Sequence, residues 1–352
     1  EMMQHDITIP EKYGIYQTVG DSVGPGGWAR LLRNVPVFTD MARKIEKLSP
    51  GAIILNYTNP MAGLTGAISE STSLRNVGLC HGVFGTRAYL ARIFEVDATD
   101  IALRYGGINH FFWILDFSVK GENGYKLLRE KLGSDTLLKY DKASKDAAGF
   151  SDNNHELFSE LYENFGYLTY SADRHTSEFF TRYLTDLEMI EKFKLVRTSM
   201  ADRQDSIDKA KQYALDLAAG KEKIRTKSVE TAVDIMKAFV TNKAFIDVVN
   251  LPNTGQIDNL PRGAVVETLG MVDAGGFAPI CLGSMPEPLK HISEVHCQIQ
   301  LMTLEAAMTG NKKLALEALM LDPLCAKLTL SDVRTMASEL LDATKDYLPR
   351  FK

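Results

Sequence analysis

Two short apolar runs, each closed by polar residues and followed by a helical pattern, constrain this chain most strongly. AIILNYTNP covers residues 52–60, and NVGLC covers residues 76–80. A continuous apolar run of this length is typical of a strand buried on both faces of a parallel sheet. Helical spacing follows each run, over 61–69 and 83–94. This succession of strand, helix, strand and helix predicts a doubly wound α/β sheet.

Two of the predicted strands end in side chains of the kind that bind metal ions: NVGLC, and the run IALRYGGINH at residues 101–110. Cys80 closes the earlier strand, with His81 directly after it, and His110 closes this one. Because the carboxyl ends of parallel strands meet at one edge of a sheet, a thiolate and an imidazole would meet there and form a metal site. The alternative is that Cys80 is a small core residue, which is the more frequent case for a lone cysteine.

The other patterns complete the expected fold. Residues 1–28 are expected to form a long loop, and a helix should follow over 28–48 with a kink or break near Pro36. FFWILDFSV, residues 111–119, predicts antiparallel strands, and strands should return over 245–282. Further helices are expected over 156–165, 206–219, 229–240 and 287–309.

Length and charge limit the function. The 352 residues exceed what one core usually serves, so two packed domains are expected, over 1–110 and 111–352. A net charge of −5 with mixed signs argues against a nucleic-acid binder and favours a small-molecule partner. No run approaches the roughly 20 apolar residues of a membrane span. The four scattered cysteines suit reduced thiols in a cytoplasmic protein.

A nucleotide-binding sheet normally opens with a strand and a Gly-rich turn of the GxGxxG type. The sequence contains no such unit. GPGG at 24–27 precedes a helical pattern but follows no strand, which makes it a weak phosphate-loop candidate. We therefore expect the chain to enter its sheet partway through. Two alternatives follow: a protein of this length, in which NAD binding is in doubt, or a larger protein with a preceding amino-terminal segment, which the abrupt start inside a loop favours.

Several longer motifs occur in a specific order. They are NYTNP at 56–60, LCHG at 79–82, GINH at 107–110 and NLPNTGQIDNLP at 250–261, with TVGDSVGPGG at 18–27 and LALEALMLDPL at 314–324. With these motifs the sequence resembles glycoside hydrolase family 4 along nearly its whole length. The resemblance implies a Rossmann-like fold related to lactate and malate dehydrogenases, lacking its first strands here, and an α+β carboxyl-terminal domain. It also implies NAD and a divalent metal, usually Mn²⁺, and cleavage by oxidation and elimination instead of paired carboxylates.

The resemblance also implies roles for single residues. Residues 1–110 would form a partial NAD-binding domain, and 111–352 would carry the substrate, metal and oligomerisation functions. Cys80 and His110 would bind the metal. The remaining assignments are substrate contacts from Asn59 and Asn109, and cofactor contacts from Asn56 and Thr58. For Asn59 the alternative is a simple turn before proline.

The base that removes the C2 proton of the sugar would lie in YSADRHTSEFF. Asp173 is the first choice, and His175 and Tyr170 are alternatives; the structural interpretation of Asp173 is a residue at a helix start. Arg174 would bind a substrate carboxylate, or else form a surface ion pair. His81 stands where phosphosugar members carry an acidic or amide residue. It would assist leaving-group protonation or shape the pocket.

The expected substrate is a nonphosphorylated α-glycoside, preferably of a uronic acid, as in the α-galacturonidase branch. An α-galactosidase or α-glucosidase of the same family is an alternative. A 2-hydroxy acid dehydrogenase of related fold is a second alternative, and a binding protein without catalysis is a third. We expect a homodimer or homotetramer that binds neither nucleic acid nor membrane.

Overall fold

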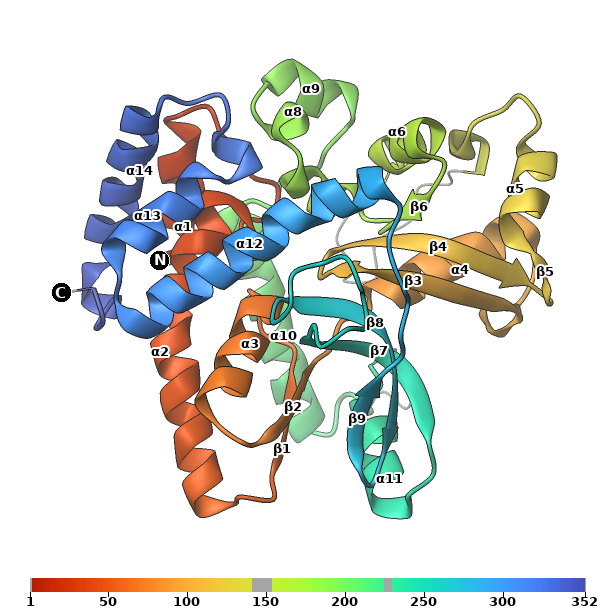
Figure 1. The fold of residues 1–352 in the computed structure, drawn as a ribbon, viewed down its shortest axis with the longest axis horizontal. Coiled ribbons are helices and arrows are strands. Elements are labelled where there is room, and N and C mark those ends of the chain that lie inside the picture. Colours follow the sequence, from red (N-terminus) through yellow and green to blue (C-terminus); the bar gives the residue numbers. More distant parts are fainter. Residues whose placement is uncertain (1, 141–153, 225–229, 352) are drawn as a thin grey trace.

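The computed structural model describes residues 2–140, 154–224 and 230–351 and is built around one mixed sheet with helices packed against it (Figure 1). The strands follow the order β1-β2-β7-β8-β3-β4-β5, while β6 pairs with β4 and β9 pairs with β8. Their bounds are β1 Ile53–Asn56, β2 Arg75–Gly78, β3 Ile101–Ile108, β4 Phe111–Val119, β5 Glu122–Asn123, β6 Leu168–Thr169, β7 Phe245–Pro252, β8 Val265–Asp273 and β9 Gly276–Pro279. The expected α/β architecture is confirmed.

The direction of β3 differs from the expectation. β1 and β2 pair in parallel, whereas β2, β7, β8, β3 and β4 each pair antiparallel with the next. β3 is therefore separated from β2 by two strands and runs opposite to it, so the expected parallel arrangement of these two strands is wrong. Apolar patterns could not show this, because a buried strand has the same pattern in either direction.

One register row across the sheet nevertheless joins β2 to β3. Gly78 at the end of β2 lies opposite Asn250 of β7, which in turn lies opposite Glu267 of β8. Glu267 lies opposite Gly107, near the end of β3. Because the intervening pairs reverse direction, β2 and β3 approach this row from opposite sides and both end close to it. The residues that follow the two strands therefore begin at the same row.

The helices agree with the sequence patterns in several places. The bounds are α1 Met2–Glu11, α2 Gly24–Leu48, α3 Met61–Ser71, α4 Gly82–Phe94, α5 Gly124–Leu132, α6 Glu156–Phe165, α7 Asp173–Thr176, α8 Thr181–Leu184, α9 Leu187–Lys192, α10 Met200–Ala218, α11 Ala232–Thr241, α12 Glu287–Thr309, α13 Lys312–Met320 and α14 Leu330–Ala343. The bounds expected for α6 and α12 are confirmed. The expected start at Val229 lies outside the described residues. None of the described helices combines the length and the apolar character that crossing a membrane requires.

Residues 2–11 form helix α1, so the loop expected over 1–28 is wrong there and is confined to residues 12–23, between α1 and α2. α1 packs against α2, and its Asp6 makes a buried ion pair with Arg33 at 2.5 Å. α2 begins at Gly24 and continues through Pro36 without the break that the sequence suggested as one possibility. Pro36 is buried, so packing of this helix face outweighs the roughly 3 kcal/mol that an interior proline costs.

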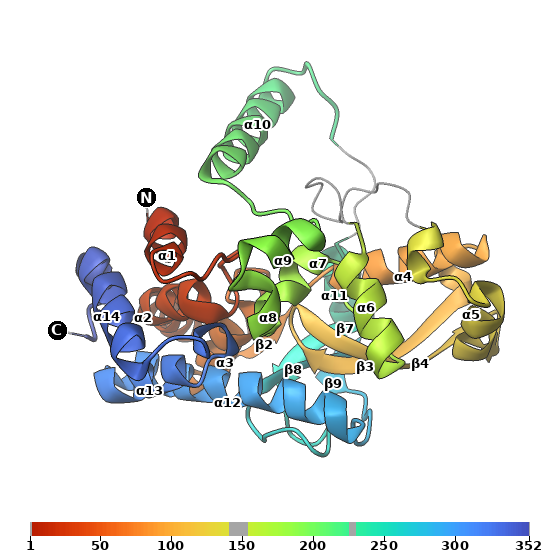
Figure 2. The same cartoon turned by 90° about the horizontal axis from the view of Figure 1, so that it is seen from above.

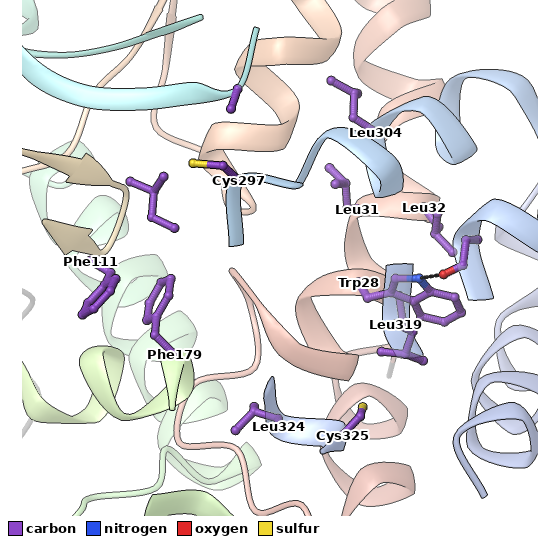
Figure 3. Close-up of a cluster of buried hydrophobic side chains, with 14 of the residues drawn as sticks. Trp28, Leu31, Leu32, Phe111, Phe179, Cys297, Leu304, Leu319, Leu324 and Cys325 are labelled. Atoms are coloured by element: carbon purple, nitrogen blue, oxygen red, sulfur yellow. Dashed lines mark hydrogen bonds between the residues drawn. The ribbon is translucent and has the colours of Figure 1, made fainter. Parts of the chain in front are cut away.

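A large apolar core joins the helices to the sheet (Figure 3). Trp28 of α2 is buried, and its Nε1 donates to the carbonyl oxygen of Ala315 in α13 at 2.7 Å. On the sheet side, the rings of Phe111 and Phe179 stack with centroids 4.8 Å apart. Such buried aromatic contacts are rigid anchors. They fix α2 on one side and the segment around residue 179 on the other.

Helix α10 stands away from the rest of the molecule (Figure 2), and none of its residues is buried. It begins before the expected Ser206 because Ser199 caps it, accepting the N–H of Asp202 at 3.0 Å. Its first turn reaches the body of the protein, where Nη2 of Arg203 donates to the carbonyl oxygen of Val19 at 2.5 Å.

Candidate active site

The ends of β2 and β3 are linked through the buried carboxylate of Glu267. Its Oε2 accepts hydrogen bonds from the side-chain amides of Asn109 and Asn250, both at 3.0 Å. The Asn109 amide also acts on the Cys80 thiol and favours its charged form, which lowers the pKa of Cys80 against the larger effect of burial. These contacts bring Cys80, two residues past β2, to the turn after β3 that carries Asn109 and His110.

Burial keeps both candidate metal ligands uncharged. It lowers the pKa of His110 to about 4, although the Asp21 carboxylate acts in the opposite direction. It raises the pKa of Cys80 to about 12, and the Glu267 carboxylate adds to this effect. A neutral imidazole is the form that binds a metal ion, whereas a thiol must lose its proton on binding. Metal binding to this pair would therefore release a proton from Cys80.

The loop before α2 reaches His110 from the helical side. Ser22 Oγ lies 3.0 Å from Nδ1 of His110 and donates to Asp21 Oδ1 at 2.9 Å. The second oxygen of that carboxylate, Oδ2, accepts from the side-chain amide of Asn59 at 3.4 Å. Asp21 therefore connects Asn59, the residue predicted to contact substrate, with the predicted metal ligand His110.

Two further rings gather at His110. The ring centroid of His175 lies 4.4 Å from that of His110, and the ring of Tyr170 stacks at 5.9 Å. Tyr170 also lies against Gly82, where an added Cβ would stand 2.9 Å from Cζ and 3.2 Å from the hydroxyl oxygen. The hydroxyl end of Tyr170 is therefore beside the turn that follows Cys80. Burial lowers the pKa of His175 well below its usual 6.5, so this imidazole is neutral.

Asp173 and Arg174 are engaged in other contacts. The two carboxylate oxygens of Asp173 accept the backbone N–H groups of Leu157 at 2.9 Å and Phe158 at 3.0 Å. These bonds satisfy donors in the first turn of α6, the kind of structural role considered for Asp173 from the sequence. Arg174 donates from Nη1 to Thr198 Oγ1 at 2.8 Å. Asp173 thus holds the first turn of α6. Arg174 contacts Thr198, the residue before the N-cap of α10.

The other predicted residues lie in the NYTNP turn and at the start of α4. Asn56 is buried, and its side chain hydrogen-bonds the N–H of Thr58 at 2.9 Å and Thr65 Oγ1 at 3.1 Å. Asn56 therefore builds the turn, while Thr58 is exposed at its tip. His81 is half-buried, and its Nδ1 lies 2.8 Å from Glu230 Oε1.

Four residues of this site were not predicted from the sequence: Asp21, Ser22, Asn250 and Glu267. Asp21 and Ser22 belong to TVGDSVGPGG, whose glycines suggest a loop or a phosphate-binding turn and give no sign of a role for the two polar residues. Glu267 does carry a signal, because it is an acidic residue in the middle of the apolar, period-two run AVVETLGMVD, whose other acidic residue, Asp273, stands at its end. Acidic residues in buried strands are rare unless they have specific partners, and here the partners are two asparagines.

A second buried carboxyl group, that of Glu178, holds the loop that carries Asp21. Its Oε1 accepts the backbone N–H groups of Val19 at 2.8 Å and Gly20 at 2.7 Å. Burial raises the pKa of Glu178 from 4.5 to about 7, although the two backbone hydrogen bonds act in the opposite direction. The loop is therefore fixed by a group that titrates near neutral pH.

We expect Glu178 to make the free energy of unfolding depend on pH. The folded state binds its proton more tightly than the unfolded chain, so this stabilisation is complete below the ordinary pKa of 4.5 and is lost as pH rises through about 7. The shift corresponds to about 3 kcal/mol. Glu178→Gln, neutral and isosteric, should remove this component. Urea unfolding of both proteins across this pH range checks it, and equal pH dependences would contradict it.

The donor chemistry of Cys80 and His110 suits a divalent transition metal, for which thiolate and imidazole are common ligands. Ser22 occupies Nδ1 of His110, which leaves Nε2 as the ligand atom. Within the described ranges, no group of three or more His, Cys, Asp or Glu side chains is placed to hold an ion. A metal here would have two protein ligands and keep open positions, as catalytic metal sites do.

Comparison with known proteins gives the same family for both halves of the chain. The model for family 4 glycosyl hydrolases matches residues 1–96, and the model for the C-terminal domain of this family matches residues 105–325. An α-galacturonidase of Lachnoclostridium phytofermentans is 33% identical over 99% of this chain and 78% of its own length. An α-galactosidase of Bacillus subtilis is also 33% identical, over 99% of this chain and 78% of its own length.

Solved structures show the same fold. The putative glucosidase lplD of Bacillus subtilis superposes with a TM-score of 0.87 at 30% identity, over 97% of this chain and 80% of that one. A 6-phospho-β-glucosidase of Thermotoga maritima, solved with manganese, NAD⁺ and glucose-6-phosphate, has a TM-score of 0.74 at 23% identity, over 98% and 78%. Since both family models match and the LCHG and GINH motifs meet at one site, the chain belongs to the family 4 glycosyl hydrolases.

Proposed function

We propose that this protein hydrolyses α-linked glycosides of nonphosphorylated sugars and prefers uronic acids such as galacturonic acid. The observation that carries the proposal is the grouping of Cys80, Asn109, His110 and Tyr170 where β2 and β3 end. Membership of the family supports a glycosidase, and the relative from Lachnoclostridium phytofermentans supports the uronic acid. His81 after Cys80 supports a nonphosphorylated sugar.

We propose Cys80 and His110 as ligands of Mn²⁺, and Thr58, at the exposed tip of the NYTNP turn, as a contact for NAD. When bound, these two groups supply oxidation at C3 of the sugar and polarisation of the oxygen there, which makes the C2 proton acidic. Asn59 and Asn109 would orient the sugar hydroxyls. Glu267 fixes the Asn109 amide for this role.

Tyr170 is the base that we favour for the C2 proton, with His175 as the alternative. The hydroxyl end of Tyr170 lies beside the turn after Cys80 while its ring stacks on His110, so it is adjacent to both proposed ligands. His175 is neutral and could accept a proton, but its burial weakens it as a base. Asp173 is disfavoured because its carboxylate holds the first turn of α6. His81, next to Glu230, would protonate the leaving group or shape the pocket.

We expect a nitrophenyl α-galacturonide to be cleaved with a kcat/KM at least about 10-fold above that of the α-galactoside. Arg174 would bind the C6 carboxylate, and a hydrogen bond to a charged group contributes about 1.5–3 kcal/mol. Arg174→Gln should remove this preference and leave galactoside cleavage little changed. Steady-state assays with α-galacturonide, α-glucuronide, α-galactoside and α-glucoside measure it.

The matched control for this experiment is Arg182→Gln, which removes an exposed guanidinium from α8. It should leave all four rates unchanged. A clear preference of the wild-type protein for a neutral sugar would overturn the uronic acid proposal. It would favour the α-galactosidase alternative, which the equally similar relative from Bacillus subtilis supports.

We propose the division at residue 110 between a cofactor-binding part and a part for substrate, metal and self-association, and a homodimer or homotetramer as the active form. The four cysteines are unpaired in the structure. Unpaired cysteines are typical of reducing compartments, which supports a cytoplasmic location.

A further inference from the structure

We infer that Asp21 and Ser22 form a hydrogen-bond relay that positions His110 and fixes which of its ring nitrogens is offered to a metal ion. The inference rests on the proposed function, because it takes His110 as a ligand. It assigns a role to two residues that neither the motif pattern nor the family comparison singles out. The function of this relay is to orient the ligand, and neither residue is proposed to bind the metal itself.

The direction of each hydrogen bond in the relay follows from the chemistry of its members. Ser22 has a single hydroxyl hydrogen, and an ionised carboxylate can only accept. The bond of 2.9 Å between Ser22 Oγ and Asp21 Oδ1 therefore uses the hydrogen of Ser22. The bond of 3.0 Å between Ser22 Oγ and Nδ1 of His110 must then use a hydrogen on Nδ1. A neutral imidazole carries only one N–H, so Nε2 keeps its lone pair for a ligand.

The loop that carries the relay is held independently of any ligand. Glu178 accepts the N–H groups of Val19 at 2.8 Å and Gly20 at 2.7 Å, immediately before Asp21. On the other side of the relay, Gln17 Nε2 donates to the carbonyl oxygen of Val23 at 2.9 Å. The loop around Ser22 is thus fixed on both sides by buried side chains, which is what a positioning residue requires.

The relay also connects to the residue proposed to contact substrate. Asp21 Oδ2 accepts from the Asn59 amide at 3.4 Å while Oδ1 accepts from Ser22. A single carboxylate therefore orients a substrate contact and, through one hydroxyl, a metal ligand. Outer partners of metal-binding histidines commonly change metal affinity by about 10- to 100-fold when they are removed.

The first test is the binding of Mn²⁺ alone, measured by isothermal titration calorimetry on the full chain. Ser22→Ala should raise the Kd for Mn²⁺ by about 10- to 100-fold. Ser22→Thr keeps the hydroxyl and should restore most of the affinity. The matched control is Ser69→Ala, which removes the half-buried hydroxyl that pairs with Asn76 away from this site. An unchanged Kd in Ser22→Ala would overturn the inference.

The second test needs no metal and reads the tautomer directly. In metal-free protein labelled with ¹⁵N-histidine, long-range proton–nitrogen spectra should show the hydrogen of His110 on Nδ1, with the signal assigned from its loss in His110→Gln. Asp21→Asn can still accept from Ser22 and should keep this tautomer, whereas Ser22→Ala should shift it towards Nε2–H. A hydrogen on Nε2 in the wild-type protein would refute the relay.

The two tests separate failure of the relay from failure of the proposed function. A wild-type protein that shows the Nδ1–H tautomer, dependent on Ser22, but does not bind Mn²⁺ would support the relay geometry and refute the metal assignment of His110. A protein that binds Mn²⁺ equally well with and without the Ser22 hydroxyl would keep the metal site and refute the relay.

Discussion

His110→Ala and Cys80→Ser are each expected to lower Mn²⁺-dependent kcat/KM by about 1,000-fold or more while the fold survives. A metal that polarises a reacting oxygen contributes several kcal/mol to transition-state stabilisation, and each 1.4 kcal/mol is about a factor of ten in rate. With two protein ligands proposed, the loss of either leaves only one. Serine is a poor substitute for cysteine because a hydroxyl does not ionise as readily as a thiol. Metal content and steady-state kinetics on purified variants measure the effect.

The control for the cysteine is Cys281→Ser, since Cys281 is also unpaired but exposed. It should retain full metal occupancy and turnover. Thermal unfolding of the metal-free proteins shows whether each variant folds, and added Mn²⁺ should raise the unfolding temperature of wild type and Cys281→Ser alone, because a ligand that binds only the folded state stabilises it. Full occupancy and turnover in Cys80→Ser would show that the proposed metal site is wrong.

The two strand ends that carry this site could be recognised from local patterns. NVGLC and IALRYGGINH each combine an apolar run with a polar end, and these features depend on neighbours in sequence. The same holds for α6 and α12, whose bounds agree with the helical spacing of the sequence. Local periodicity is sufficient wherever an element buries one continuous face.

The direction of β3 and the residues around Glu267 depend on contacts that are distant in sequence. β3 pairs with β8, where Gly107 lies opposite Glu267. These two residues are 160 positions apart in the chain. No local pattern specifies that pairing. Ser22 and His110 are 88 residues apart, and their contact depends on how α2 packs against the core. The α/β class was therefore predictable, whereas the row that assembles the site was not.

Asp173 shows a different limit of sequence analysis. An acidic residue within a segment of ionisable side chains is compatible with a catalytic base and with a helix-capping residue. Only the hydrogen-bond partners of the carboxylate decide between these roles. In the structure the carboxylate accepts from the N–H groups of Leu157 and Phe158. Tyr170, three positions before Asp173, and His175, two positions after it, are instead the side chains whose rings approach His110.

The second large effect is expected at C2 of the released sugar. Hydrolysis in heavy water should leave deuterium at C2, because the base that takes the C2 proton exchanges it with solvent before a hydrogen returns. A glycosidase that uses paired carboxylates breaks the glycosidic bond without touching C2, so its product would keep hydrogen there. Proton nuclear magnetic resonance of the product distinguishes the two routes without knowledge of the rate-limiting step.

Tyr170→Phe should lower turnover, and the rate at which deuterium enters C2, by about 100- to 10,000-fold, the usual contribution of a positioned general base. Phenylalanine keeps the ring that stacks on His110 and packs on Gly82, so the variant removes the hydroxyl alone. Asp173→Asn is the informative comparison: weakening its bonds to α6 should cost about 1 kcal/mol of stability but preserve deuterium entry. Loss of deuterium entry in His175→Gln but not in Tyr170→Phe would transfer the role to His175. A product that stays fully protonated at C2 while the wild-type protein turns over in heavy water would refute the oxidation and elimination route.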